Sequence, residues 1–272
     1  MATGQIRSTR SFCRVCIVAC GIVVDSEGDR VVKVRGDFDH ALTRGYTCPK
    51  GRALVQAHHS PDAITRPMMR KNGEQVEVGW EECLDDLAGK LRTIIDAHGP
   101  DAIGVYQGGG LGLDAAGRRM AEHFYNGLGA PPKFTPITID TTAKTMVSST
   151  MGGYPGFLAH TDYDNVGMML YIGVNPMVSH GHITRMFNPA VNIRAVARRG
   201  EVWTIDPLRT ETAKFSTRHI QPWPGKDYAI LAWLVREVLD GGPVSLAQSV
   251  EGMDELRALL AGYDLATAAG IA

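Results

Sequence analysis

Apolar and polar residues follow two different periods along this chain, and the change of period separates its beginning from its later parts. Residues 21–36 contain two β-rich runs, GIVV and RVVKV, joined by the turn-forming stretch DSEGD at 25–29. This arrangement predicts a β-hairpin. A Pro-containing stretch at 60–70 follows the hairpin. Over 80–97 the apolar residues recur at helical spacing, which predicts an amphipathic helix.

The remainder of the chain alternates short apolar runs with helical patterns. Three runs end at Gly or Pro turns: 102–106 before Gly108–Gly110, 168–174 before Asn175-Pro176, and 201–205 before Asp206-Pro207. Helical patterns cover 114–128 and 227–239. Apolar runs of this kind are typical of strands buried in a parallel sheet, where ligands gather at the carboxyl ends of the strands.

These patterns predict an α/β protein with a small N-terminal β-rich domain and a Rossmann-like parallel-sheet domain. The expected boundaries are 1–60 for the β-rich domain, 61–100 for a connecting helical segment, and 101–272 for the α/β domain.

Composition adds little beyond excluding some partners. The 272 residues are 44% hydrophobic and 21% charged, with a formal net charge of -1. A charge near zero gives no support for a nucleic-acid or membrane-surface partner. No apolar run reaches the roughly 18–20 residues that cross a bilayer, and the first residues lack the apolar stretch of a secretion signal. We therefore expect a cytoplasmic protein with no nucleic-acid partner and no membrane span.

The cysteines are clustered, and their spacing is informative. Cys13, Cys16 and Cys20 lie within eight residues, and Cys48 follows 28 residues later. A tight group in a chain without an export signal indicates a metal site more than disulfides. Cys83 stands apart inside the predicted helix and is interpreted as a small buried hydrophobe.

The Cys-x2-Cys-x3-Cys pattern with a remote fourth cysteine favours an iron–sulfur cluster. A [4Fe–4S] cluster takes four thiolates, three of which one looping segment can supply at these gaps. Four cysteines also form structural zinc sites, but these usually pair their ligands as two CxxC knuckles, and the second knuckle is missing here. Zinc is the main rival, and unligated thiols are the third alternative.

Together with the cysteine pattern, further motifs resemble the dimethyl-sulfoxide-reductase family of molybdenum and tungsten oxidoreductases, particularly its formate-dehydrogenase-like branch. They are GDFDHALTRGYTCPKGRAL at 36–54, VGWEECLDDLAGKL at 78–91, YIGVNP at 171–176, TIDPLRTETA at 204–213 and QPWPGKD at 221–227. The resemblance extends from about residue 8 to residue 265. It implies a [4Fe–4S] cluster that relays electrons to or from Mo or W held by two molybdopterin guanine dinucleotides.

The resemblance also implies dinucleotide-contacting residues at the strand ends. They are Gly173, Asn175, Pro176, Asp206, Arg209, Gly225 and Asp227. Asp206 is placed like the acidic residue that accepts hydrogen bonds from a ribose, Arg209 can pair with pyrophosphate, and Asp227 can accept from a guanine edge. Lys50 resembles the basic residue between cluster and pterin, where a cation favours electron transfer. The other interpretation of Lys50 is a solvated surface lysine.

The sequence departs from the resembled family at the metal. The motif that supplies a Cys or selenocysteine ligand in formate-dehydrogenase-like members aligns with 139–156, where Met146 occupies the ligand position and Val147 the following histidine position. A thioether is a poor ligand for a high-valent, oxo-binding metal, so we expect a packing role for Met146. Possible substitutes are Thr145, Ser148 and Ser149, and Asp140 is a further candidate.

A second departure is length, because members of the resembled family continue for several hundred residues beyond the last motif. We expect the cluster domain plus a truncated first dinucleotide-binding domain. The predicted function is that of a molybdopterin-dependent oxidoreductase fragment or subunit with a small-molecule substrate and a redox carrier or partner subunit, possibly completed by a separate C-terminal chain. The alternative is a non-catalytic iron–sulfur electron-transfer or assembly subunit that needs a partner chain; a zinc-stabilised binding module is a third class.

Overall fold

The computed structural model describes residues 5–129, 131–156, 161–181, 185–241 and 251–272. The chain divides into two compact units, Met1–Ala159 and His160–Ala272. The fold is mixed α/β, with an antiparallel sheet in the first unit and a three-stranded parallel sheet in the second.

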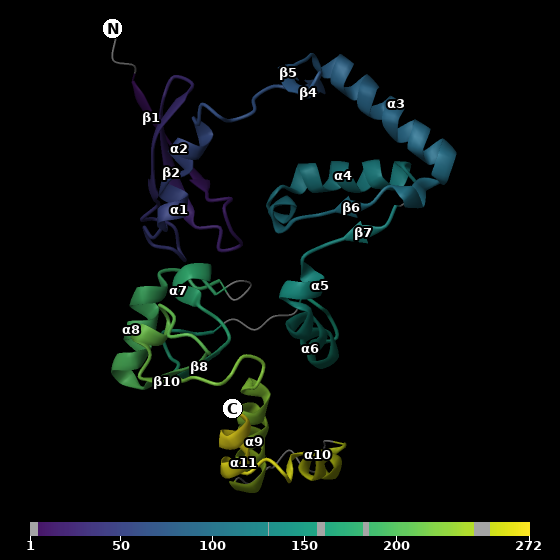
Figure 1. Cartoon of the computed structure of the whole chain (residues 1–272). Helices are drawn as coiled ribbons and strands as arrows, with labels where there is room; N and C mark the ends of the chain where they lie inside the picture. Colours follow the sequence, from purple (N-terminus) through teal and green to yellow (C-terminus); the bar gives the residue numbers. More distant parts are fainter. Residues whose placement is uncertain (1–4, 130, 157–160, 182–184, 242–250) are drawn as a thin grey trace. The chain divides into compact units, whose positions relative to one another are not determined.

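The N-terminal sheet has three antiparallel strands in the order β1-β2-β3 (Figure 1). The strands are β1 (Ile6–Phe12), β2 (Gly21–Glu27) and β3 (Arg30–Gly36). The predicted hairpin is confirmed as β2 and β3. Strand β1 was not predicted, because its sequence IRSTRSF is mostly polar and all seven residues are exposed. It forms through pairing along the whole of β2, from Ile6 opposite Glu27 to Phe12 opposite Gly21.

Two short helices follow the sheet, and the connecting segment is not wholly helical. It contains an antiparallel hairpin before its long helix. The elements are α1 (Pro49–Arg52), α2 (Leu54–His58), β4 (Met68–Lys71), β5 (Glu74–Glu77) and α3 (Trp80–His98). Helix α3 agrees with the predicted helix over 80–97. Cys83 on this helix is partly exposed, so its interpretation as a buried residue is wrong.

The rest of the first unit is built around a two-stranded parallel sheet. Its elements are η1 (Pro100–Ala102), β6 (Val105–Tyr106), η2 (Gly109–Leu113), α4 (Ala115–Gly127), β7 (Lys133–Phe134), α5 (Ile137–Asp140) and α6 (Thr142–Gly152). Strand β6 is shorter than the predicted 102–106, because the residues before it form the 3-10 turn η1. The Asp114 carboxylate caps α4 by accepting from the Gly117 N–H at 3.0 Å.

The second unit contains a parallel sheet in the order β10-β9-β8. Its elements are β8 (Met168–Ile172), α7 (Pro176–Ser179), α8 (Pro189–Arg199), β9 (Glu201–Ile205), η3 (Ala213–Phe215) and β10 (Arg218–Ile220). Helix α8 lies between β8 and β9 in the chain and was not predicted from the sequence. Its buried residues join strand residues in the core, which comprises Tyr171, Met186, Ile193, Val196 and Val202.

Three helices complete the second unit, with α9 contacting both α10 and α11. They are α9 (Asp227–Gly241), α10 (Met253–Leu260) and α11 (Leu265–Ile271). The Trp223 N–H donates to the carbonyl of Ala272 at 2.7 Å, which ties the segment before α9 to the end of the described chain. Among the described residues, none of the helices combines the length and apolarity that a membrane span requires.

Candidate functional site

The three clustered cysteines lie in the loop that joins β1 to β2. The loop covers residues 13–20, and its flanking residues Phe12 and Gly21 are paired across the two strands. The Cys13 N–H donates to the Cys20 carbonyl at 2.8 Å, which closes the loop at its base. Inside it, the Ala19 N–H donates to the Cys16 carbonyl at 3.2 Å. One tight loop therefore carries three sulfur atoms.

The fourth cysteine returns to this loop because the segment after β3 folds back onto Gly21. The Asp37 N–H donates to the Gly21 carbonyl at 3.0 Å, and the Gly21 N–H donates to Thr43 Oγ1 at 3.2 Å. Cys48 is then the N-cap of α1. A Cβ placed on Gly51 of α1 would lie 3.4 Å from Cys13 Sγ, so the first turn of α1 lies against the cysteine loop.

The thiols are shielded from solvent and influence one another. Cys13, Cys20 and Cys48 are buried, and Cys16 is partly exposed. Burial raises the pKa of Cys20 to about 11, with smaller contributions from the other three thiols. Burial likewise raises the pKa of Cys13, whereas the positive charge of Lys50 lowers it. The pKa values of Cys13 and Cys20 therefore depend on the charges of the other thiols as well as on burial.

This arrangement fits a [4Fe–4S] cluster. In such a cluster each of the four thiolates binds a different iron, so the sulfur atoms need not meet around a single ion. Within the parts of the chain that the structure describes, no three or more Cys, His, Asp or Glu side chains are arranged to hold one metal ion. A Cβ at Gly51 would lie 2.4 Å from Thr47 Oγ1, so glycine allows α1 to pack closely at this point, where Cys13 Sγ is also near.

The carboxyl ends of β8 and β9 form the second predicted site. Ile172 and Ile205 are paired at these ends, and the Gly173 N–H donates to the Ile205 carbonyl at 3.0 Å. Gly173 has a φ of 59° and open space around its Cβ position, as a close backbone approach to a ligand requires. Asn175 follows as the N-cap of α7, with Pro176 at the first helical position. The structure thus brings Gly173, Asn175 and Pro176 beside the end of β9.

Asp206, at the end of β9, is 8% exposed. Its backbone N–H donates to the Ile220 carbonyl at 3.1 Å, which joins it to β10. Its Oδ1 accepts from the Leu208 N–H at 2.9 Å, so one carboxylate oxygen shapes the turn after the strand.

The remaining predicted contacts are not joined to Asp206 by hydrogen bonds among the described residues. Arg209 is exposed in the loop after β9. Gly225 has a φ of 75° and open space around its Cβ position, and Asp227 is in the first turn of α9. Both follow β10 in the chain, on the segment that leaves the sheet at its carboxyl end.

Two residues that the sequence pattern did not indicate hold the Asn175 side chain. Thr212, fully buried, donates from Oγ1 to Asn175 Oδ1 at 2.7 Å, and its backbone N–H donates to the same oxygen at 3.3 Å. The Asn175 amide donates to Glu211 Oε2 at 2.7 Å, which lowers the pKa of that carboxyl. Both residues lie in the TIDPLRTETA motif, 36 and 37 residues after Asn175. Contacts over such a separation cannot be read from the pattern of neighbouring residues.

The position aligned with the metal ligand lies on α6. Met146 is 64% exposed and Val147 is 55% exposed, so the packing role expected for Met146 is not found among the described residues. The Thr145 hydroxyl donates to the Thr141 carbonyl at 2.9 Å, and the buried Ser148 hydroxyl donates to the Tyr154 carbonyl, also at 2.9 Å. Both hydroxyls therefore donate hydrogen bonds to backbone carbonyls, one at the start of α6 and one in the turn after it.

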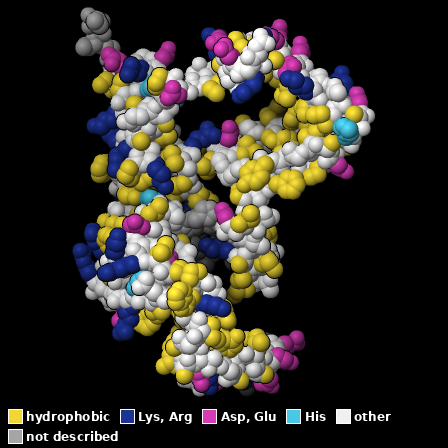
Figure 2. Space-filling view, in the orientation of Figure 1, with side chains coloured by type: hydrophobic (Ala, Val, Ile, Leu, Met, Phe, Trp, Pro, Cys, Tyr) yellow, Lys and Arg dark blue, Asp and Glu magenta, His cyan; other side chains and the backbone are white. Residues whose placement is uncertain are grey.

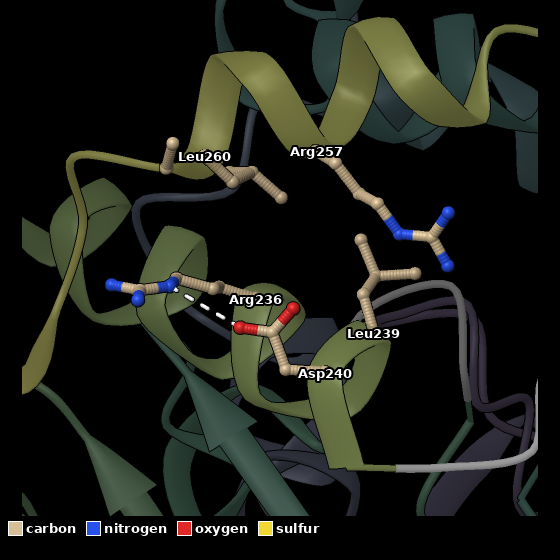
Figure 3. Close-up of a pocket in the computed structure, with 6 residues that line it drawn as sticks. Arg236, Leu239, Asp240, Arg257 and Leu260 are labelled. Carbon is tan, nitrogen blue, oxygen red and sulfur yellow. Dashed lines mark ion pairs between the residues drawn. The ribbon is translucent and has the colours of Figure 1, made fainter.

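A cavity of about 170 Å³ lies between α9 and α10 (Figure 3). Its lining comprises Arg236, Leu239, Asp240, Arg257, Leu260 and Ala261. Arg236 Nε and Asp240 Oδ2 are 3.4 Å apart, an i,i+4 pair on α9 whose charges satisfy one another. None of the predicted cofactor residues lines this cavity.

Comparison with known proteins identifies the chain. Residues 6–60 match the molybdopterin oxidoreductase Fe4S4 domain. Residues 64–240 match the molybdopterin oxidoreductase family model, which is more than half of the chain. The chain belongs to the molybdopterin oxidoreductase family. Membership implies a [4Fe–4S] cluster and a molybdopterin carrying Mo or W.

Similar molybdopterin oxidoreductases include enzymes named for different substrates. A nitrate reductase of Symbiobacterium thermophilum is 29% identical over 241 residues, which cover 86% of this chain and 31% of that protein. The F420-dependent formate dehydrogenase 2 subunit alpha of Methanococcus maripaludis is 25% identical, covering 96% of this chain and 38% of that protein. Acetylene hydratase from Pelobacter acetylenicus has the same fold, with a TM-score of 0.71, 18% identity, and coverage of 96% of this chain and 36% of that one. The chain spans about a third of the length of the curated relatives it matches.

Proposed function

We propose that Cys13, Cys16, Cys20 and Cys48 ligate a [4Fe–4S] cluster that passes electrons to or from a Mo or W centre on molybdopterin. One observation carries the proposal: three cysteines share a hairpin loop closed by the Cys13–Cys20 hydrogen bond, and α1 brings Cys48 to that loop. The bound cluster supplies one-electron chemistry. The thiolates would hold it, and the burial of Cys13, Cys20 and Cys48 limits the access of water to three of the sulfur atoms.

Lys50 is proposed as the basic residue on the electron path. It is exposed, two residues after Cys48, and its charge favours the Cys13 thiolate. A positive charge between the cluster and the pterin stabilises an electron added to the cluster. Lys50→Gln should therefore lower the cluster's midpoint potential while Lys50→Arg keeps it. Equal potentials for the two variants would refute the role.

The dinucleotide is proposed to lie along the carboxyl ends of β8 and β9. Support comes from the open positive-φ glycine Gly173 and from the remaining carboxylate oxygen of Asp206, which can accept from a ribose hydroxyl. Arg209 would pair with pyrophosphate, and Gly225 and Asp227 would meet the guanine. Asn175 and Pro176 would shape the turn, since the Asn175 side chain is bonded to Thr212 and Glu211.

Metal analysis tests the cluster assignment. The chain is purified anaerobically, and iron, sulfide, Mo, W and zinc are quantified alongside EPR spectra of the dithionite-reduced protein. Replacing any one of the four proposed ligands by Ser should remove most of the iron and the EPR signal. Cys83→Ser is the matched control, because Cys83 lies on α3 outside the cysteine loop. Iron that survives the ligand substitutions, or zinc in place of iron, refutes the proposal.

The segment after the cluster domain is proposed to pack against further polypeptide of the kind that makes up the rest of its relatives. Sheets of parallel strands are normally covered on both faces, yet Tyr106 of β6 is 68% exposed and Phe134 of β7 is 57% exposed. Helix α3 has no buried residue, although Leu84 and Leu87 are apolar. Figure 2 shows apolar side chains at the surface around these strands and around α5 and α6.

We propose that a small-molecule substrate, a redox carrier and this complementing polypeptide together make the catalytic unit, located in the cytoplasm. Native mass and Mo or W content of the protein isolated from its source test this. A larger assembly containing Mo or W supports an enzyme. A 29 kDa species with iron alone would instead favour the electron-transfer or assembly subunit. Fractionation of cells tests the compartment.

A further inference from the structure

Thr47 stands immediately before the fourth cysteine and carries a buried hydroxyl with no partner. The residue is 4% exposed, and its Oγ1 makes no hydrogen bond within the described part of the chain. Its backbone carbonyl, in contrast, accepts from the Arg52 guanidinium. Native proteins rarely leave a buried hydroxyl unpaired, because the desolvated group costs free energy unless something accepts its proton.

The hydroxyl is directed at Gly51, whose Cβ position also lies close to Cys13 Sγ. The Cβ position of Gly51 lies 2.4 Å from Thr47 Oγ1 and 3.8 Å from Thr47 Cβ. Thr47 Oγ1 is thus nearer to this position than Thr47 Cβ is, by about the length of a C–O bond. The Cβ–Oγ1 bond is therefore directed at the Cβ position of Gly51. Cys13 Sγ is 3.4 Å from the same point. The separation between Oγ1 and Sγ therefore cannot exceed the sum of these two short distances.

We propose that the Thr47 hydroxyl donates a hydrogen bond to a sulfur of the cluster at its Cys13 corner and thereby sets the cluster's reduction potential. The inference rests on the proposed ligation by the four cysteines. A hydroxyl is the only donor on this side chain, and thiolate and sulfide sulfurs accept hydrogen bonds more strongly when the cluster is reduced and more negative. Hydrogen bonds to the sulfurs consequently raise the potential.

Thr43 provides a matched control within the same domain. It is also buried, at 5% exposure, but its hydroxyl accepts from the Gly21 N–H at 3.2 Å and lies 3.1 Å from His40 Nδ1. Replacing either threonine by valine removes one buried hydroxyl and keeps the shape of the side chain. Of the two changes, only that at Thr47 removes a hydroxyl that has no partner among the described residues and lies near Cys13.

The experiment is an EPR-monitored redox titration of the cluster-loaded full chain, with iron and sulfide content measured on each sample. Thr47→Val should lower the midpoint potential, because it shifts the reduction equilibrium several-fold toward the oxidised cluster. A tenfold shift corresponds to about 59 mV for one electron. Thr47→Ser, which keeps the hydroxyl, should titrate like the unchanged protein. Thr43→Val should keep the potential and lower the melting temperature, because it leaves the Gly21 N–H without its acceptor.

A Thr47→Val protein with normal iron content and an unchanged potential would overturn the inference while leaving the ligation intact. An equal shift in Thr43→Val would overturn it too, because the effect would then not depend on a donor near the sulfur. An unchanged chain that holds no cluster when purified anaerobically refutes the ligation itself, and the role of Thr47 with it.

Discussion

Replacing Gly51 by alanine tests the close approach of α1 to the cysteine loop. The added Cβ would lie 2.4 Å from Thr47 Oγ1 and 3.4 Å from Cys13 Sγ. Thr47 is buried and β-branched, so turning its side chain away moves a methyl group into the same crowded space. Overpacking of this kind costs about 1–3 kcal/mol, which is roughly a 5- to 150-fold change in the population of the correctly folded loop.

We therefore expect Gly51→Ala to retain less iron and sulfide per chain and to lose cluster absorbance faster on exposure to chelator. The double substitution Gly51→Ala with Thr47→Ala should recover much of the iron, because the nearest Thr47 atom would then be its Cβ at an ordinary 3.8 Å. Gly89→Ala on α3 is the control, since nothing lies within 4 Å of its Cβ position. Normal iron content in Gly51→Ala, or no recovery in the double variant, would show that the packing argument is wrong.

Three further predictions concern other parts of the chain. Thr212→Val should free the Asn175 side chain and weaken the binding of GDP, a probe for the guanosine diphosphate part of the cofactor, several-fold. Thr212→Ser keeps the hydroxyl and should keep the affinity. Equal GDP affinities of the two variants in calorimetry would contradict this prediction. The Ser8 hydroxyl donates to Asp25 at 2.7 Å and lowers the pKa of that carboxyl, so Ser8→Ala should cost about 1 kcal/mol near neutral pH. A carboxyl whose pKa is lowered in the folded state adds stability at pH values above its unfolded pKa, and this stability is lost as the pH falls. The difference in unfolding free energy between the unchanged protein and Ser8→Ala, measured with urea, should therefore become smaller in acid. A difference that stays constant with pH would argue against the assigned cause. Ile193→Ala should lower unfolding free energy by about 2–5 kcal/mol, because the side chain is fully buried, with iron content unchanged; a loss below about 1 kcal/mol would not fit a core position.

The local sequence determined the chemistry of the cluster site and several elements around it. The Cys-x2-Cys-x3-Cys spacing requires only that one short loop present three sulfurs, a constraint that neighbouring residues satisfy among themselves. The hairpin of β2 and β3, helix α3 and the strand β9 were predicted for the same reason. Their apolar period or turn residues are contained within a few consecutive positions.

Contacts between distant residues were decided by the tertiary structure alone. Strand β1 exists because β2 pairs with it, although its own residues are polar. The hold of Thr212 on Asn175 spans 37 residues, and the approach of Thr47 and Gly51 to Cys13 depends on the chain turning back after β3. Period and propensity describe neighbours along the chain, whereas these contacts follow from hydrogen bonding and steric fit between segments that only folding brings together.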